Sequence, residues 1–357
     1  MAALEFDPDA AALPDGGIYG LPFTPEESRV VLVPVPWDAT TSYRRGTADG
    51  PAAIRAASGQ IDLLDVETGT PYRAGIAMLD ESPELLAWNL EGRALADPVI
   101  AAAGRTHGDP ALEQAVADVN ALSARVDAWV ARETERWLAA GKLVGIVGGD
   151  HSVPFGAIAA VARRHPGLGV LHVDAHADLR DAYEGFTGSH ASIMHNVVHR
   201  IPEVARLVQV GIRDLCEAED ELVRRSDGRI VAHFEAEVRA ELLAGGTWAA
   251  RVASIVSALP ADVYLSFDID GLDPTLCPHT GTPVPGGLSF AEATYLIGAV
   301  ARSGRRIVGF DLTEVAPGPD GDEWDANVGM RLLYKMIGWA LVSNGLAPAR
   351  APLTRAR

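Results

Sequence analysis

The sequence has few cysteines, few aromatic residues and a deficit of positive charge. Cys216 and Cys277 are the only cysteines among 357 residues, which excludes a disulfide framework and a thiolate metal site and favours a reducing compartment. The 30 Lys and Arg residues stand against 48 Asp and Glu residues, which gives a formal net charge of −18. This charge argues against nucleic acid or an anionic membrane as a partner and mildly favours cationic substrates.

Long apolar runs and targeting signals are also missing. Charged residues interrupt every apolar stretch before it could span a bilayer. The first ten residues, MAALEFDPDA, lack the basic and apolar regions of a signal peptide. We therefore expect a cytoplasmic protein without a membrane anchor. With 48% apolar and 22% charged residues, the composition is that of a globular protein and excludes a largely disordered chain.

Short runs rich in Val, Ile and Leu alternate with longer patterns of helical period. The runs predict buried strands at residues 29–36, 143–147, 168–173, 207–212, 263–267 and 306–310. Apolar residues recur at helical spacing over 112–138 and 330–341, and Ser289 with Glu292 forms a capping box before a further helix. Strands that alternate with helices predict an α/β fold with a parallel sheet covered on both faces.

The chain is expected to form one domain with short extensions. Residues 1–28 are rich in Pro, Gly and Asp, which predicts an irregular N-terminal extension. Residues 29–345 carry the strands and helices of a single domain, and residues 346–357 form a C-terminal tail. Gly, Pro and polar residues interrupt the pattern over 82–110, so we interpret this segment as an inserted excursion.

Four predicted strands run directly into histidines and carboxylates. The motifs at their ends are GGDHS (148–152), DAHAD (174–178), DID (268–270) and DLTE (311–314). Ligands of open parallel sheets bind at the carboxyl ends of the strands, so these side chains are expected to converge. A lone Asp or His at a strand end is more often a loop hydrogen-bonding residue, but the combination of D-x-H-x-D with D-x-D favours a metal site.

The candidate metal ligands are His151, Asp174, His176, Asp178, Asp268 and Asp270. Three of them would spread over ~13 Å along a straight strand, at about 3.3 Å per residue, so the chain is expected to bend after Asp174. Four carboxylates balance two divalent cations, and nitrogen and oxygen ligands fit Mn²⁺, Fe²⁺, Ni²⁺ or Zn²⁺. Two such cations lower the pKa of a shared water toward ~7.

These motifs resemble the signatures of a known enzyme superfamily. GGDHS, DAHADLRD (174–181) and SFDIDGLDP (266–274) are similar to the three signatures of the arginase/agmatinase (ureohydrolase) superfamily. PWDATTSY (36–43) and TGTP (280–283) resemble further stretches of its agmatinase-like members. The resemblance covers roughly residues 30–341. It implies one three-layer α/β/α domain with a central, mainly parallel sheet, assembled as a homo-oligomeric trimer or hexamer.

The resemblance also implies roles for individual residues. It implies two metal ions, with Mn²⁺ first and Ni²⁺ as the alternative; one is held by His151, Asp174, Asp178 and Asp268, the other by Asp174, His176, Asp268 and Asp270. Glu314 would accept the substrate guanidinium, and His190 would give a proton to the leaving amine. His279 and Thr282 are further candidates for substrate contact, although a loop histidine without such a role explains His279 equally well. Ala191 stands where the family commonly has glycine.

The expected reaction is hydrolysis of a small cationic guanidino compound to urea and an amine. Agmatine, which would give putrescine, is the first candidate. The loop at 182–188 lacks the arginase-type pattern for an amino-acid head group, and free guanidine or a small substituted guanidine is the alternative. A formimino substrate and a non-catalytic family subunit are further alternatives, and the complete ligand set counts against the subunit. A single-zinc deacetylase would not need His151 or Asp270, and a dinuclear phosphoesterase would need basic residues for phosphate.

Overall fold

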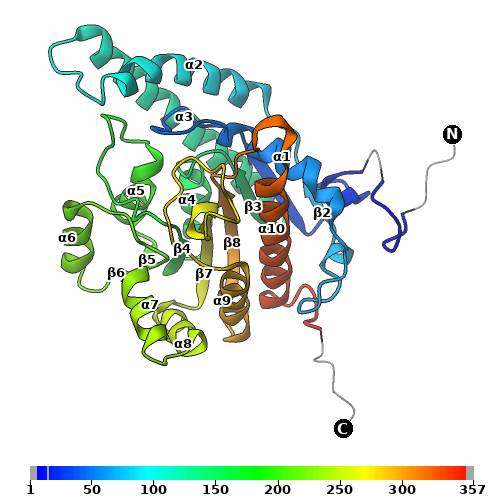
Figure 1. Ribbon diagram of the computed structural model, residues 1–357. Helices are drawn as coiled ribbons and strands as arrows, with labels where there is room; N and C mark the ends of the chain where they lie inside the picture. Colours follow the sequence, from blue (N-terminus) through cyan, green and yellow to red (C-terminus); the bar gives the residue numbers. More distant parts are fainter. Residues whose placement is uncertain (1–5, 14–15, 351–357) are drawn as a thin grey trace.

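The computed structural model describes residues 6–13 and 16–350, which are built around one parallel β-sheet (Figure 1). Its eight strands lie in the order β2-β1-β3-β8-β7-β4-β5-β6, and each neighbouring pair is parallel. The strands are β1 (Val30–Val35), β2 (Ile76–Met78), β3 (Leu143–Gly148), β4 (Leu168–Val173), β5 (Val204–Val210), β6 (Ile230–His233), β7 (Asp262–Asp268) and β8 (Arg306–Thr313).

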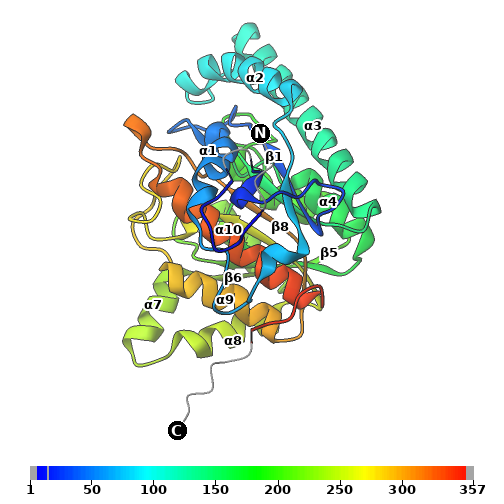
Figure 2. The same ribbon diagram turned by 90° about the vertical axis from the view of Figure 1, so that its right-hand side faces the viewer.

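Helices cover both faces of the sheet. One layer contains α1 (Gly50–Ala57), α8 (Trp248–Ala258), α9 (Phe290–Arg302) and α10 (Trp324–Ser343). The other contains α3 (Pro110–Ala139), α4 (Phe155–Arg164), α5 (Ile193–Arg200) and α6 (Glu217–Arg225). Figure 2 shows α9 and α10 on one side of β1 and β8, with α3 and α4 on the other. This arrangement confirms the predicted three-layer α/β/α fold.

The alternation of side chains along β1 explains why both layers are needed. Val30 and Leu32 pack into the core beneath α9 and α10, whereas Val31, Val33 and Val35 pack into the core beneath α3 and α4. Successive residues of a strand point to opposite faces, so a strand that is apolar at every position must be buried on both. All six predicted strands are present. The two that the sequence did not reveal, β2 and β6, are short and lie at the edges of the sheet.

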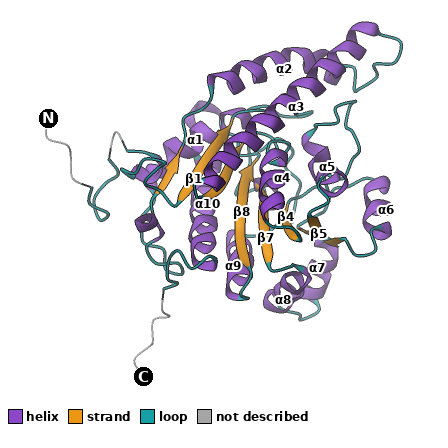
Figure 3. Cartoon of the chain, turned by 180° about the vertical axis from the view of Figure 1, so that it is seen from behind, coloured by secondary structure: helices purple, strands orange, loops and turns teal. Residues whose placement is uncertain are grey.

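Residues 82–110, interpreted from the sequence as an inserted excursion, are mostly helical despite their Gly, Pro and polar residues. They contain α2 (Pro83–Ala101), a helix that pairs with α3 to form a long hairpin at one end of the molecule (Figure 3). Pro83 occupies the first turn, where a missing N–H costs nothing. A Cβ at Gly92 would lie 2.8 Å from the Trp37 ring, so this glycine permits close packing rather than a break. The predicted capping box of Ser289 and Glu292 begins α9.

The N-terminal residues join the main core. A 3-10 turn, Ile18–Gly20, buries its side chains against the layer of α10. The Tyr19 hydroxyl donates a hydrogen bond to the carbonyl of Met330 at 3.1 Å. Parts of the expected extension (1–5, 14–15) and of the expected tail (351–357) lie outside the described residues.

Among the helices that the structure describes, none is long and apolar enough to cross a membrane. The remaining helix, α7 (Glu235–Leu243), follows β6.

Candidate functional site

The strand order brings the four polar motifs together. β3, β8, β7 and β4 are consecutive in the sheet, and their carboxyl ends lie at the same edge (Figure 1). GGDHS follows β3, DLTE ends β8, DID ends β7 and DAHAD follows β4. The expected convergence therefore depends on four central strands that are far apart in the sequence and adjacent in the sheet.

Gly149 fixes the position of the first motif. A Cβ at this residue would lie 2.0 Å from the carbonyl oxygen of Trp37, so only glycine allows the two chains to approach this closely. Its carbonyl accepts a hydrogen bond from the Glu314 amide at 2.8 Å. The His151 amide in turn donates to Oε1 of Glu314 at 2.9 Å. These two hydrogen bonds join the GGDHS motif to the DLTE motif.

The chain turns after β4 and after β7. The His176 amide donates to Oδ1 of Asp174 at 2.6 Å, and Asp178 has a positive φ of 54°, so the chain bends as its spacing required. After β7, the Asp270 amide donates to Oδ1 of Asp268 at 2.8 Å within a 3-10 turn. Both turns bring carboxylates closer to one another than an extended strand would.

The six predicted ligands form a cluster, called the ligand cluster below, in which Asp174 has the central place. His151 Nδ1 lies 2.9 Å from Oδ2 of Asp174 and 3.3 Å from Oδ2 of both Asp178 and Asp268. His176 Nδ1 lies 3.4 Å from Oδ1 of Asp174 and 3.1 Å from Oδ2 of Asp270. Each oxygen of Asp174 thus faces a different histidine, an arrangement suited to a carboxylate shared between two cations.

The electrostatics of the ligand cluster fit bound cations. Burial and the nearby charge of Asp174 raise the pKa of Asp178 to about 7, and burial with the charges of Asp270 and Asp174 raises the pKa of Asp268. Burial lowers the pKa of His151, but hydrogen bonds to the surrounding aspartates outweigh it and raise the pKa overall. Carboxylates that destabilise one another when charged are stabilised by divalent cations. The nitrogen and oxygen donor set suits such ions.

A second layer of buried polar side chains supports the ligand cluster. His151 Nε2 lies 2.9 Å from the Ser266 hydroxyl, which donates to Oδ1 of Asp311 at 3.1 Å. His172 was not among the predicted ligands. One of its ring nitrogens lies within 4.8 Å of ligand atoms of His151, Asp174 and Asp178, close enough for the four residues to surround one metal ion. Burial lowers the pKa of His172. Metal-binding histidines are commonly oriented by such partners.

Glu314 and His190 lie together beside the ligand cluster. His190 Nδ1 is 3.4 Å from Oε1 of Glu314. Burial lowers the pKa of His190, but the hydrogen bond and charge of Glu314 outweigh it and raise the pKa to about 9. Glu314 has a positive φ of 60°, a backbone strain of a kind that is concentrated at functional sites. Glu314 Oε2 and His190 Nε2 are both buried without a hydrogen-bond partner in the described part of the chain.

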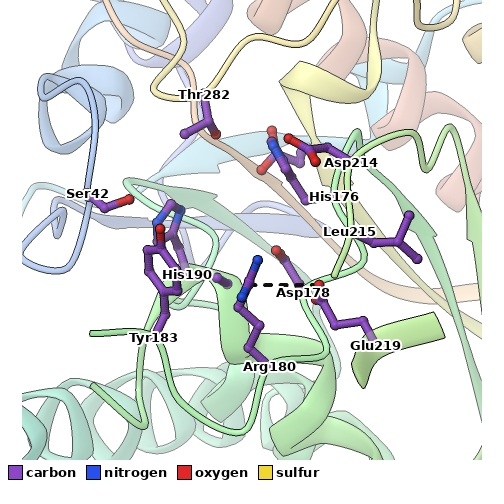
Figure 4. A pocket seen from close by; sticks show the side chains of 12 residues that line it. Ser42, His176, Asp178, Arg180, Tyr183, His190, Asp214, Leu215, Glu219 and Thr282 are labelled. Atoms are coloured by element: carbon purple, nitrogen blue, oxygen red, sulfur yellow. Dashed lines mark ion pairs between the residues drawn. The ribbon is translucent and has the colours of Figure 1, made fainter. Parts of the chain in front are cut away.

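A pocket of about 170 Å³ opens beside His190, and Glu314 is not part of its lining (Figure 4). Of the predicted site residues, its lining includes His176, Asp178, His190, Asp268 and Thr282. The Thr282 hydroxyl donates to Oδ2 of Asp270 at 3.3 Å. His279 is not part of this lining, because its Nδ1 and its amide both bind the carboxylate of Asp325 at 2.9 Å. A substrate contact by His279 thus has no support from its position.

Other lining residues were not recognised in the sequence. We call them the pocket mouth: Ser42, Arg180, Tyr183, Asp214, Leu215 and Glu219. The Arg180 guanidinium lies over the Tyr183 ring, and its Nε is 3.8 Å from Glu219 (Figure 4). One signal was available, because Asp214 follows β5, the neighbour of β4, and the strand-end rule covers β5 as well. Ser42, Arg180 and Tyr183 lie in stretches that the resemblance covers, but the sequence assigned no contact to these individual residues.

Comparisons with known proteins agree with this geometry. A family described as "Arginase family" matches residues 28–338. N(1)-aminopropylagmatine ureohydrolase of Thermus thermophilus is 34% identical over 324 residues, 90% of this chain and 94% of that protein. Guanidinobutyrase of Pseudomonas aeruginosa is 33% identical over an alignment that covers 86% of this chain and 84% of that protein. Proclavaminate amidino hydrolase from Streptomyces clavuligerus shares the fold with a TM-score of 0.70 at 23% identity, covering 94% of this chain and 100% of that one.

Proposed function

The chain belongs to the arginase family and is a hydrolase of guanidino carbon–nitrogen bonds, and on this premise we propose that it cleaves agmatine to putrescine and urea. Relatives of similar identity include proteins named agmatinase, one of them from Bacillus anthracis at 30% identity over 88% of this chain. The guanidinium group, which every such substrate shares, is the part that the site is best equipped to hold.

The observation that carries the proposal is the pair of unpartnered atoms beside the ligand cluster. Glu314 Oε2 is a buried acceptor without a donor in the described chain. A buried carboxylate oxygen left unpaired is costly, and a guanidinium N–H supplies the charge-assisted bond that satisfies it. His190 Nε2 is buried beside it and is equally free. The Glu314 oxygen therefore supports the presence of a nitrogen-rich cation at this position, and His190 Nε2 is free to act on it as a proton donor.

The ligand cluster supports the hydrolytic half of the proposal. His151, Asp174, Asp178 and Asp268 would hold one divalent cation, and Asp174, His176, Asp268 and Asp270 would hold a second. Two divalent cations, when bound, supply Lewis acidity and make water nucleophilic at neutral pH. Mn²⁺ is the proposed metal and Ni²⁺ the alternative.

The chain's own residues account for the remaining steps. Glu314 orients the guanidinium so that its carbon faces the ligand cluster. Water adds to this carbon, the bond from carbon to the alkyl-substituted nitrogen breaks, and that nitrogen leaves as the amine. With a pKa of about 9, His190 is protonated at neutral pH, and its Nε2–H gives the proton that the leaving amine takes up. The products are urea and the amine.

A second candidate, free guanidine or a small substituted guanidine, is favoured by Arg180. This permanent cation lies in the pocket mouth, where it opposes the terminal ammonium group of agmatine. Asp214 lines the same region and provides an opposing attraction. A small guanidine carries the guanidinium charge but lacks the terminal ammonium group on which these two residues would act. The balance of these two residues therefore separates the candidates.

Urea release from a matched panel tests the proposal. Protein loaded with Mn²⁺ or with Ni²⁺ is assayed with agmatine, 4-guanidinobutyrate, arginine, methylguanidine and guanidine. We expect the highest kcat/KM with agmatine. Urea formed from small guanidines alone would favour the second candidate. No urea from any member, with two metals bound, would contradict both and leave a formimino substrate or a non-catalytic role.

Glu314→Gln sharpens this experiment, since it keeps the size of the side chain and removes its charge. We expect kcat/KM for the best substrate to fall about 10- to 100-fold, the range for hydrogen bonds to charged groups. The bound metal should be unchanged, because Glu314 is not in the ligand cluster. Unaltered kinetics in this variant would show that Glu314 does not hold the guanidinium.

A further inference from the structure

Two buried side chains beneath the ligand cluster have no part in the proposed hydrolysis. His172 is the penultimate residue of β4, two positions before Asp174, and Gln209 is its register partner on β5. Both side chains are completely buried. Polar groups in this position cost free energy unless their hydrogen bonds are satisfied, so the pattern of those bonds is informative.

The orientation of the Gln209 amide follows from its neighbours. Gln209 Nε2 lies 2.7 Å from the carbonyl oxygen of Ala177 and 3.0 Å from Nδ1 of His172. A carbonyl oxygen only accepts, so the amide nitrogen must face it, because the reversed amide would place two acceptors in contact. The second hydrogen of the same nitrogen then points at Nδ1 of His172. This assignment leaves Nδ1 as an acceptor without a proton.

The proton position on His172 follows in turn. A neutral imidazole with an unprotonated Nδ1 carries its hydrogen on Nε2. His172 Nε2 lies 2.8 Å from Oδ2 of Asp174 and therefore donates to it. A nitrogen that carries a hydrogen has no lone pair for a metal. Although His172 is within reach of the cluster, it is thus a hydrogen-bond donor to a ligand and not itself a ligand.

The geometry points to a relay from Ala177 through Gln209 and His172 to Asp174, and we propose that Gln209 and His172 are positioning residues that set the orientation of the shared carboxylate. His172 donates to Oδ2 of Asp174, while the His176 amide donates to Oδ1. The two donors prevent the carboxylate from rotating and keep one oxygen facing each histidine of the cluster. At its other end the relay holds Ala177, which lies between His176 and Asp178.

This inference rests on the dinuclear centre of the proposed function, so its test measures metal binding and not activity alone. The full-length protein is stripped with a chelator and titrated with Mn²⁺ alone. Electron paramagnetic resonance follows both free Mn²⁺ and the exchange-coupled signal of two neighbouring ions. We expect the wild type to bind two Mn²⁺ with a coupled signal.

His172→Phe fills the same space without a donor. We expect the dissociation constant of the second Mn²⁺ to rise about 10- to 100-fold, the usual effect of losing such a supporting partner. His172→Gln, whose amide nitrogen takes the place of Nε2, should retain near wild-type binding. Gln209→Leu should weaken binding in the same direction as His172→Phe. The double variant should be no weaker than His172→Phe, since the two residues act in series.

His233→Phe is the matched control, because His233 is a buried histidine near the end of β6 and outside the ligand cluster. Far-UV circular dichroism and thermal unfolding of the metal-free proteins identify variants that fail to fold. If His172→Phe fails to fold, His172→Gln and Gln209→Leu still test the proposal. Wild-type Mn²⁺ affinity in folded His172→Phe and Gln209→Leu would overturn the relay. Equal loss in His172→Gln would also overturn it and would make His172 a ligand.

The outcome separates this inference from the proposed function. If the wild type binds no pair of Mn²⁺ ions, the dinuclear centre and the relay are both wrong. If the wild type binds the pair and every His172 and Gln209 variant does so equally well, the relay alone is wrong. A selective loss of the second ion and of the coupled signal in His172→Phe and Gln209→Leu supports the relay.

Discussion

The ligand cluster and the pocket mouth differ in how they are built. The cluster comes from the ends of three central strands, and its side chains are almost completely buried except for His176: the exposures are 1% for His151, 0% for Asp174 and 24% for His176. The mouth comes mainly from loops, with Glu219 contributed by α6, and the Arg180 side chain is 36% exposed. Strand ends in a register-fixed sheet hold atoms rigidly, whereas loops vary in length and composition. We therefore expect the cluster to determine the type of reaction and the mouth to determine which substrate enters.

Glu314 and His190 lie between these regions and share features of both. Glu314 follows the end of β8 and is bonded to the His151 amide, as the cluster residues are bonded to one another. His190 belongs to a loop and lines the pocket. Glu314 Oε2 and His190 Nε2 have no hydrogen-bond partner in the described part of the chain, which leaves both atoms able to bond to a substrate. Variants of the ligand cluster, of Glu314 and His190, and of the pocket mouth should separate effects on metal binding, proton transfer and substrate specificity.

Asp268→Asn is expected to have the largest effect. Loss of one cluster carboxylate removes a ligand and unbalances the charge, so urea release should fall on the order of a thousandfold or more as the water loses its activation. Metal analysis should show fewer than two ions per chain. Asp214→Asn, which removes a carboxylate from the mouth, is the control and should keep both ions. Equal metal content in the two variants would remove the distinction between cluster and mouth.

His190→Asn is expected to lower kcat about 100-fold, as for loss of a general acid. Because the pKa of His190 is raised to about 9, its protonated form is present at neutral pH and is lost as the pH rises through about 9. The wild-type kcat should therefore decline on the alkaline side. That decline should be absent in His190→Asn and should move to lower pH in Glu314→Gln. An alkaline limb that persists unchanged in His190→Asn would assign the proton to another group.

Arg180→Gln is expected to have the smallest effect, confined to substrate preference. Removal of a positive charge from a water-filled mouth should lower the KM for agmatine about fivefold relative to methylguanidine, corresponding to about 1 kcal/mol. The metal content and the pH profile should be unchanged. Arg224→Gln, an exposed arginine paired with Asp220 outside the pocket, is the matched control. The same KM ratio in both variants would show that Arg180 does not sense the substrate tail.

The central part of the fold could be read from the sequence. A strand buried on both faces is expected to be largely apolar; β1 and β3 have no polar side chain, and β4, β7 and β8 each carry an apolar run that made them recognisable. β2 and β6 escaped notice because short strands at the edges of the sheet leave little pattern. α2 escaped because Gly92 and Pro98 usually interrupt helices, and only the contact of Gly92 with Trp37 explains its presence. Such contacts between distant segments leave no local trace.

The residue types and spacings of the ligand cluster were determined by the sequence alone, since D-x-H-x-D and D-x-D follow strands whose ends must meet at one edge. The tertiary structure decided the rest. The order β3-β8-β7-β4 brings those ends together, Asp325 binds His279 outside the pocket lining, and Gln209 determines which nitrogen of His172 bears the proton. The physical reason is that local composition encodes what a segment can bury or bind, whereas pairing, orientation and proton placement depend on neighbours supplied by distant parts of the chain.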